Sequence, residues 1–153
     1  MRNLKLLAAL MLCASLALLA RAEEGKKTPP AKSDKELLQG TWKVVKKTKG
    51  GEAEDVKDNP MTIKFAGDVA TATMGGETKG EGTFTIDESK SHRWITLTGT
   101  SGPNAGREFA AIYELDGDTL KLAYSTGENN KTRPKDFSGK EGEAAEVLER
   151  QKP

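Results

Sequence analysis

The stretch Leu37–Lys47, "LLQGTWKVVKK", places Gly-x-Trp where a short helix would pass into a first strand. Just upstream, "SDKELLQG" offers Ser33 as the helix cap, Glu36 three residues later, and Gly40 as the terminator. This spacing is typical of a capping box, in which each of the two side chains accepts a hydrogen bond from the other residue's backbone N–H. It predicts a helix of one or two turns that leads directly into "TWKVV".

After this stretch the chain has the pattern of short strands separated by turns. Apolar residues alternate with Lys and Thr in "MTIKF", "FTI", "ITL" and "LKLAY", so each strand has one face for water. The predicted strands cover residues 41–48, 61–65, 69–74, 82–86, 94–98, 109–115, 119–125 and 145–150.

The connections between these strands indicate how they pair. Asp116-Gly117, between two of the strands, is a two-residue hairpin signal because a type I′ turn needs positive φ at both positions. Short antiparallel strands at such close spacing predict an all-β fold, either an up-and-down barrel or a sandwich. We favour an eight-stranded antiparallel barrel with a short N-terminal helix, since a barrel closes its own edges.

The first residues have the pattern of an export signal. A basic start precedes an apolar run at 6–20, and "ARA" at 20–22 is a small-x-small cleavage pattern. The run is shorter than the roughly 20 residues that span a bilayer. We therefore expect 1–22 to be a cleaved signal peptide, with a retained N-terminal anchor as the alternative. The charged, Pro-containing segment 23–32 predicts a flexible linker, which leaves 33–153 as one barrel domain.

The charge distribution and the cysteine content argue against several classes of binding partner and chemistry for this protein. The chain has 24 Lys and Arg against 23 Asp and Glu, with a formal net charge of +1. The two signs are interspersed, which argues against a nucleic-acid or anionic-membrane footprint. Cys13, the only cysteine, lies in the predicted signal peptide. The rest of the chain therefore offers no disulfide, thiol nucleophile or zinc–thiolate site.

The motifs of common enzymes and metal sites are missing. His92 is the only histidine and has no second ligand at metal-binding spacing, so we interpret it as a surface residue. No Gly-x-Ser-x-Gly elbow occurs, and nothing singles out a pair of carboxylates for glycoside hydrolysis. We expect a protein that is not an enzyme and holds no metal or cofactor.

The Gly-x-Trp stretch resembles the lipocalin superfamily. In that family the tryptophan of the first strand closes the barrel base, and an arginine from the last strand lies across its indole. Trp42 and Arg150 match these two by position. A guanidinium over an indole is worth about 0.5–2 kcal/mol, and an ordinary core role for Trp42 is the alternative. The Thr-Asp-Tyr segment of the best-known lipocalins is replaced by "YELDGDTLK", so the resemblance does not extend to their receptor-docking and retinoid roles.

A second resemblance covers nearly all of the chain after the predicted signal peptide. The motifs "LQGTWKVV", "GEGTFTID", "IYELDGDTLKL" and "RPKDF", in this order, are similar to a family of small exported lipocalin-like domains abundant in planctomycete bacteria. This resemblance implies a lipocalin-like barrel in the periplasm or outside a bacterial cell. It implies no particular activity.

Two functional classes remain. The first is a non-enzymatic module that binds a small, mostly apolar molecule inside the barrel. Trp94, Tyr113 and Tyr124 are the predicted ligand-binding residues, since each joins an apolar body to a polar tip; core packing without a ligand is the alternative for them. The second class is a cell-envelope interaction or structural module with a protein or polysaccharide partner. It predicts a filled barrel and exposed apolar residues clustered on one outer face.

Two of the connections between predicted strands are long, residues 49–59 and 127–143. Residues 49–59 would form a flap over the open end of the barrel, or an acidic surface loop. Residues 127–143 are long for a structureless loop, and we expect Arg133 and Phe137 to anchor it, Phe137 as an apolar plug. We prefer the binding module by analogy, as a monomer that binds no nucleic acid and is not stably inserted in a membrane after cleavage.

Overall fold

The computed structural model describes residues 31–127 and 130–152, so the predicted signal peptide and most of the predicted linker lie outside it. The described chain begins with helix α1 (Asp34–Leu38), and a 3₁₀ helix, η1 (Gly102–Asn104), lies between β6 and β7. The strands are β1 (Gly40–Lys49), β2 (Glu52–Glu54), β3 (Met61–Ala66), β4 (Val69–Met74), β5 (Glu77–Asp87), β6 (Arg93–Gly99), β7 (Glu108–Asp116), β8 (Thr119–Ser125) and β9 (Glu143–Arg150). None of the helices in this part of the chain is long and apolar enough to cross a membrane.

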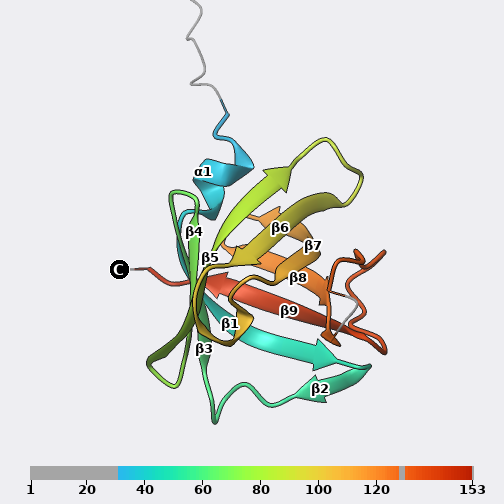
Figure 1. The fold of residues 1–153 in the computed structure, drawn as a ribbon. Helices are drawn as coiled ribbons and strands as arrows, with labels where there is room; N and C mark the ends of the chain where they lie inside the picture. The colour runs from blue at the N-terminus through green and yellow to red at the C-terminus, as the bar shows by residue number, and fades with distance from the viewer. Residues whose placement is uncertain (1–30, 128–129, 153) are drawn as a thin grey trace, which may run out of the picture. The chain divides into compact units, whose positions relative to one another are not determined.

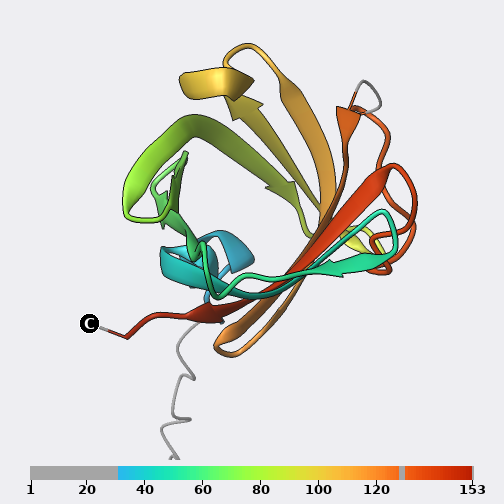
Figure 2. The same ribbon diagram turned by 90° about the horizontal axis from the view of Figure 1, so that it is seen from below.

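Eight of the strands form a closed antiparallel barrel (Figure 1). From β3 to β9 each strand pairs with the next one along the chain, and β1 pairs with both β3 and β9. Figure 2 shows how the strands follow one another around the barrel. The all-β barrel with a short N-terminal helix is therefore confirmed.

Strand β5 begins at Glu77, five residues before the predicted start at residue 82, and two further local features differ from the sequence prediction. The first is β2, which lies outside the barrel circuit and pairs only with β1. Its three residues are all exposed, so they carry no apolar alternation by which a strand could be recognised. The second is the β7–β8 hairpin, in which Asp116 still pairs with Thr119. The two loop residues are therefore Gly117 and Asp118, one position further along than predicted.

Helix α1 forms as its capping box predicts. The Glu36 N–H donates to Ser33 Oγ at 3.3 Å, and the Ser33 N–H donates to Glu36 Oε2 at 2.9 Å. Gln39 is the C-cap, and Gly40 begins β1 with a φ of 118°, which side-chain-bearing residues rarely adopt. The chain thus turns sharply from the helix into the first strand.

One end of the barrel is filled by large side chains beneath α1. Tyr113 Oη donates to Asp34 Oδ2 at 2.8 Å, and Arg93 Nη1 donates to the same oxygen at 2.7 Å, so β6 and β7 both hold the helix. The core at this end includes several large, buried side chains: Leu38, Trp42, Phe65, Phe84, Ile95, Leu120 and Leu148. Any space for a ligand must therefore lie elsewhere in the barrel.

Candidate functional site

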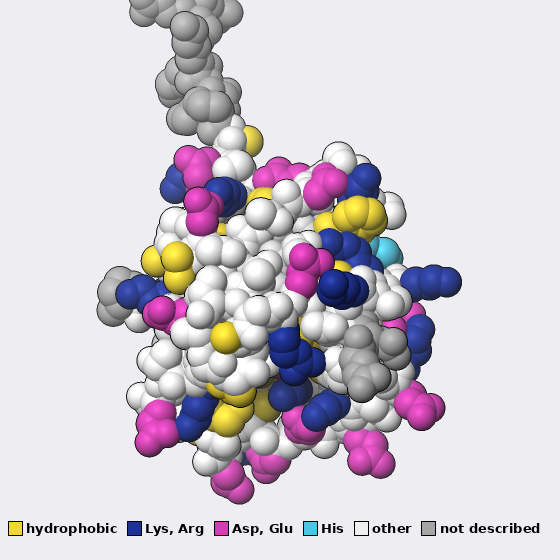
Figure 3. All heavy atoms as spheres, viewed as in Figure 1, with side chains coloured by type: hydrophobic (Ala, Val, Ile, Leu, Met, Phe, Trp, Pro, Cys, Tyr) yellow, Lys and Arg dark blue, Asp and Glu magenta, His cyan; other side chains and the backbone are white. Residues whose placement is uncertain are grey.

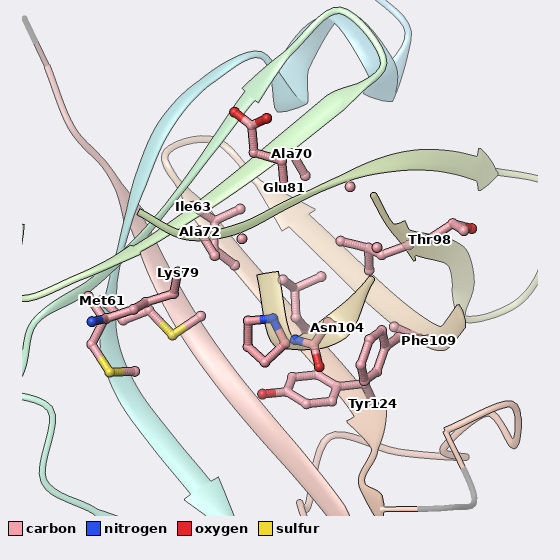
Figure 4. Close-up of a pocket in the computed structure, with 18 of the residues that line it drawn as sticks. Met61, Ile63, Ala70, Ala72, Lys79, Glu81, Thr98, Asn104, Phe109 and Tyr124 are labelled. Carbon is pink, nitrogen blue, oxygen red and sulfur yellow. The ribbon is translucent and has the colours of Figure 1, made fainter. Parts of the chain in front are cut away.

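A cavity of about 340 Å³ lies inside the barrel among side chains of β3 to β9, together with Lys47 of β1. Its walls are mainly apolar and include Met61, Ile63, Met74, Leu97, Phe109 and Leu122. Figure 4 shows Phe109 and Tyr124 side by side, with Met61 and Ile63 across the space from them. The barrel interior is therefore filled by side chains at the α1 end and holds a modest cavity further along.

The cavity exists because small residues occupy inward positions of the neighbouring strands. An eight-stranded barrel is just wide enough for its own side chains to fill. Where those side chains are only a methyl group, as at Ala70, Ala72 and Ala111, space is left. The lining glycines instead allow backbone to come close, since a Cβ at Gly82 would lie 2.6 Å from the Thr98 carbonyl oxygen. The small lining residues come from β4, β5, β6 and β7, and they are Ala70, Ala72, Gly80, Gly82, Gly99 and Ala111.

The loop between β6 and β7, which carries η1, forms part of the cavity rim. Ser101, Pro103 and Asn104 line the cavity and are exposed to solvent, so the cavity opens beside this loop. The loop lies close against β5: a Cβ added at Gly102 would lie 2.4 Å from the Lys79 carbonyl oxygen. Gly102 also has a φ of 72°, which favours glycine.

The predicted flap, residues 49–59, does not cover this cavity. None of its residues is among those that line the cavity. Instead it carries β2, and Val56 packs against the main core. The correction has a physical reason, because the β1–β2 hairpin pairs Lys49 with Glu52 and holds the segment along β1.

Two of the residues that line the cavity carry carboxylates, the exposed Glu81 on β5 and the buried Glu146. Glu146, on β9, is only 2% exposed. Its Oε1 accepts a hydrogen bond from Tyr124 Oη at 2.8 Å, whereas its Oε2 has no hydrogen-bond partner among the described residues. Burial raises the pKa of Glu146, against the hydrogen bond from Tyr124 and the nearby charge of Lys47, which both lower it.

A β-bulge in β1 brings Lys47 to this carboxylate. Val44 pairs with Leu148, but Lys46 already pairs with Val147, so β1 has one extra residue at this point. Beyond the extra residue, the odd-numbered rather than the even-numbered positions of β1 face inward. Lys47 therefore pairs with Glu146. Period-two alternation counted along β1 from Trp42 would put Lys46, not Lys47, on the inner face.

The charges around Glu146 are arranged in a row. Lys47 Nζ lies 3.0 Å from Glu54 Oε2 on β2 and 3.9 Å from Glu146 Oε1. The lysine is therefore closer to the exposed carboxylate of β2 than to the buried one. With both carboxylates ionised, the three groups carry one net negative charge.

Of the three predicted ligand-binding residues, Tyr124 is the one that lines the cavity. Trp94 lies on the outer face, between Lys90 Nζ at 4.7 Å and Arg133 Cζ at 4.6 Å from its ring centroid. Its neighbour Ile95 is fully buried, and successive residues of a strand face opposite sides, so the prediction for Trp94 is corrected. Tyr113 does point inward, but toward the filled end, where it binds α1. Tyr113 therefore does not line this cavity, but it lines a separate pocket of about 240 Å³ together with His92 and Arg93.

Arg150 and Trp42 meet at the α1 end. The guanidinium carbon of Arg150 lies 4.1 Å from the Trp42 ring centroid. Nη1 donates to the Gln39 carbonyl at 2.7 Å and Nη2 to the Leu37 carbonyl at 2.5 Å. Trp42 Nε1 donates to the Leu38 carbonyl at 2.7 Å. The pair thus lies where the first strand, the last strand and the helix meet; its effect on stability stays a prediction.

Arg133 connects the long loop before β9 to the barrel. Its Nη1 donates to the carbonyls of Ile95, at 2.9 Å, and Ala111, and its Nη2 donates to Thr96 Oγ1 at 2.5 Å. These partners belong to two neighbouring strands, β6 and β7. The guanidinium therefore lies against the outside of the sheet, with Trp94 stacked on it.

Phe137 is the second contact of this loop. It packs against a small outer cluster of Ile112, Ala123 and Ala145, which come from β7, β8 and β9. His92, an exposed residue, meets its ring edge-on at a centroid distance of 5.9 Å. The loop therefore covers part of the outer barrel surface rather than the cavity.

The described surface also has a smaller, mainly polar pocket of about 240 Å³, lined by Ser91, His92, Arg93, Tyr113, Glu114 and Leu115. On the face drawn in Figure 3, hydrophobic side chains appear in small separate groups among charged ones. Large hydrophobic residues that are exposed come from four different elements, and they are Leu37, Val45, Val69 and Trp94. Within residues 31–127 and 130–152, no group of three or more His, Cys, Asp or Glu could hold a metal ion.

The sequence of this chain also matches the model of a known protein family. A family model described as "Lipocalin-like domain" matches residues 38–141, which is more than half of the chain. No curated protein and no solved structure matches the sequence. The matched segment runs from the end of α1 through the cavity-lining strands to the loop before β9. With its closed eight-stranded barrel, the chain belongs to the family of lipocalin-like domains.

Proposed function

We propose that this protein binds one small, mostly apolar molecule in the barrel cavity and releases it unchanged. The observation that carries this proposal is the cavity of about 340 Å³ with mainly apolar walls and a few polar groups. Ligand sites typically measure roughly 300–1,000 Å³ and combine apolar walls with a small number of placed polar groups. Family membership is consistent with such a role, although a fold by itself is weak support for a function.

The envelope-interaction module is the alternative, and two observations disfavour it. It calls for a filled barrel, yet the small alanine side chains on β4 and β7 leave a cavity. It also calls for apolar residues gathered on one outer face, but the exposed ones come from α1, β1, β4 and β6. A partner that recognises polar loops would still be compatible with the described surface, so the experiment below includes that outcome.

We also propose that the chain is exported by a bacterium and acts in the periplasm or outside the cell. The support is the basic start, the apolar run and the "ARA" pattern at 20–22. N-terminal sequencing of the protein purified from its host tests this directly. A first residue at position 23 is expected, whereas a chain that begins at Met1 would contradict cleavage.

Native mass spectrometry of the protein, purified gently from its own host, tests the binding function. An adduct of small mass that is lost on denaturation is expected, and the same spectrum tests the predicted monomer. A bare protein mass, together with no uptake of the neutral dye N-phenyl-1-naphthylamine, would contradict the proposal. Cross-linking to an envelope protein or polysaccharide would then support the alternative.

A pair of variants tests whether the ligand binds inside the barrel. Ala72 lines the cavity, and Thr71 is its neighbour on β4, facing the opposite side. Ala72→Phe should fill the cavity and abolish dye uptake, whereas Thr71→Phe adds the same ring outside the barrel and should leave uptake unchanged. Equal uptake by both variants would show that the dye binds elsewhere.

A further inference from the structure

The cavity contains one feature that an apolar ligand alone would not satisfy. Glu146 is 2% exposed, lines the cavity, and leaves Oε2 without a hydrogen-bond partner among the described residues. A buried polar group without a partner typically costs about 1–3 kcal/mol. Such groups are rare in folded proteins, so each one calls for an explanation.

The groups around Glu146 define which ligand atoms would suit it. Tyr124 Oη already donates to Oε1 at 2.8 Å, so Tyr124 holds the carboxylate in one orientation. Lys47 Nζ lies at 3.9 Å from Oε1, outside hydrogen-bond range, and at 3.0 Å from Glu54. The positive charge of Lys47 is therefore shared with a carboxylate on β2, and it leaves the negative charge of Glu146 only partly compensated.

We propose that the ligand carries a hydrogen-bond-donating head group, best a protonated amine, on a compact apolar body, and that Glu146 Oε2 binds that head group. This inference rests on the proposed binding function and specifies its ligand class. Burial raises the pKa of Glu146, but an ammonium group that donates to Oε2 would favour the ionised carboxylate and would offset the net negative charge of the row Glu54, Lys47 and Glu146. The apolar body would occupy the space beside Phe109, Leu97 and Met61, which line the same cavity.

An anionic ligand would meet the opposite situation. A carboxylate head group placed beside Oε2 would bring two like charges together in a site shielded from water, which is strongly unfavourable. Two lysines, Lys47 and Lys79, also line the cavity, but each is already paired with a carboxylate, at 3.0 Å for Lys47 and Glu54 and at 2.7 Å for Lys79 and Glu77. The structure therefore favours a cationic or neutral donor over an acid.

A panel of three probes with one apolar body tests this inference by titration calorimetry at neutral pH: 1-octylamine, 1-octanol and octanoate. On the wild-type chain, 1-octylamine should bind about tenfold or more tightly than octanoate, with 1-octanol between them. Octanoate binding as tightly as 1-octylamine would overturn the proposal. This ranking needs no variant, so it remains decisive if a substitution impairs folding.

Glu146→Gln then identifies the group responsible. The side chain keeps its shape and loses its charge, so 1-octylamine affinity should fall by about tenfold or more, while 1-octanol affinity changes much less. Glu149→Gln is the matched control, because Glu149 lies on the same strand and is exposed. An unchanged preference for 1-octylamine in Glu146→Gln would overturn the assignment of Glu146.

The binding function and the role of Glu146 predict different results in these experiments. If neither the three probes nor N-phenyl-1-naphthylamine binds the wild-type chain, the proposed binding function is wrong. If the probes bind without a preference for a donor head group, the cavity binds ligands but Glu146 does not select them.

Discussion

Arg150 joins three parts of the fold through one guanidinium group. It stacks on Trp42 of β1, donates to carbonyls of Leu37 and Gln39 beside β1, and pairs with Asp118 of the β7–β8 turn at 3.0 Å. Arg150→Ala should therefore lower the free energy of unfolding by about 1–3 kcal/mol. Chemical denaturation followed by fluorescence measures this change.

The control for Arg150 is Lys152→Ala. Lys152 also pairs with Asp118, but its side chain is 81% exposed, and exposed ion pairs contribute little. Its thermal midpoint should match that of the wild type. If Arg150→Ala also leaves the midpoint unchanged, the contact with Trp42 does not stabilise the barrel, and Trp42 is an ordinary core residue.

Residue-level prediction from the sequence succeeded where the signal was local. The capping box of Ser33 and Glu36 was recognisable because both partners lie within one helical turn. Trp94 shows a missed signal: if Ile95 and Leu97 face inward, period-two alternation already places Trp94 outside. Glu146 was missed in the same way, since Ala144 and Leu148 on either side of it face the core.

At the scale of elements, the β6–β7 loop with η1 forms the rim of the cavity. Gly102→Ala adds a Cβ that would lie 2.4 Å from the Lys79 carbonyl oxygen, whereas a Cβ at Gly106 meets nothing within 4 Å. Both glycines have positive φ, 72° and 75°, so both variants share a backbone strain of about 1–2 kcal/mol. Gly102→Ala should cost about 1–3 kcal/mol more, because the loop must move from β5.

The same pair of variants tests whether this loop shapes the cavity. Gly102→Ala should weaken the uptake of N-phenyl-1-naphthylamine, and Gly106→Ala should leave it close to that of the wild type. Fluorescence titration measures both. Equal dye affinities in the two variants would show that the position of η1 does not matter for binding.

The loop before β9 depends on Arg133 for its contact with β6 and β7. Arg133→Ala removes three hydrogen bonds, two of them to backbone carbonyls. We expect limited trypsin digestion after Lys131 or Lys140 to become about fivefold faster or more, which corresponds to a loss of roughly 1 kcal/mol. Lys135→Ala, an exposed change in the same loop, is the control. Unchanged cleavage in Arg133→Ala would indicate that Phe137 alone holds the loop.

At the scale of the whole molecule, the buried carboxylate of Glu146 should make stability depend on pH. Burial raises its pKa above the ordinary value of 4.5, so the folded protein holds this proton more tightly than the unfolded chain. Stability contributed by Glu146 is therefore greatest below 4.5 and is lost as pH rises through the folded pKa. Tyr124 on β8, Lys47 on β1 and Glu54 on β2 modulate this shift.

Glu146→Gln removes this titration. The free energy of unfolding of the variant, minus that of the wild type, should therefore increase from about pH 4 to about pH 8. Urea denaturation at several pH values measures this difference. A difference that stays constant, or decreases, would mean that Glu146 does not titrate with a raised pKa in the folded state.

The sequence alone determined the fold class, the order and approximate ends of the barrel strands, and the capped helix before Trp42. These features depend on periodicity and turn chemistry within a few residues. Such local patterns can be recognised in a short segment by itself, without the positions of the other segments. The exceptions are β2, whose exposed residues show no alternation, and the start of β5, where the mostly exposed residues from Glu77 to Glu81 also lack it.

Only the tertiary structure decided where the cavity lies and what faces it. The bulge that brings Lys47 opposite Glu146 is visible only in the pairing of β1 with β9, two strands at opposite ends of the domain. The cavity itself arises because small alanines on β4 and β7 line the same space, and the β6–β7 loop borders it through its contact with β5. Such arrangements depend on register and packing between distant segments, which no local pattern specifies.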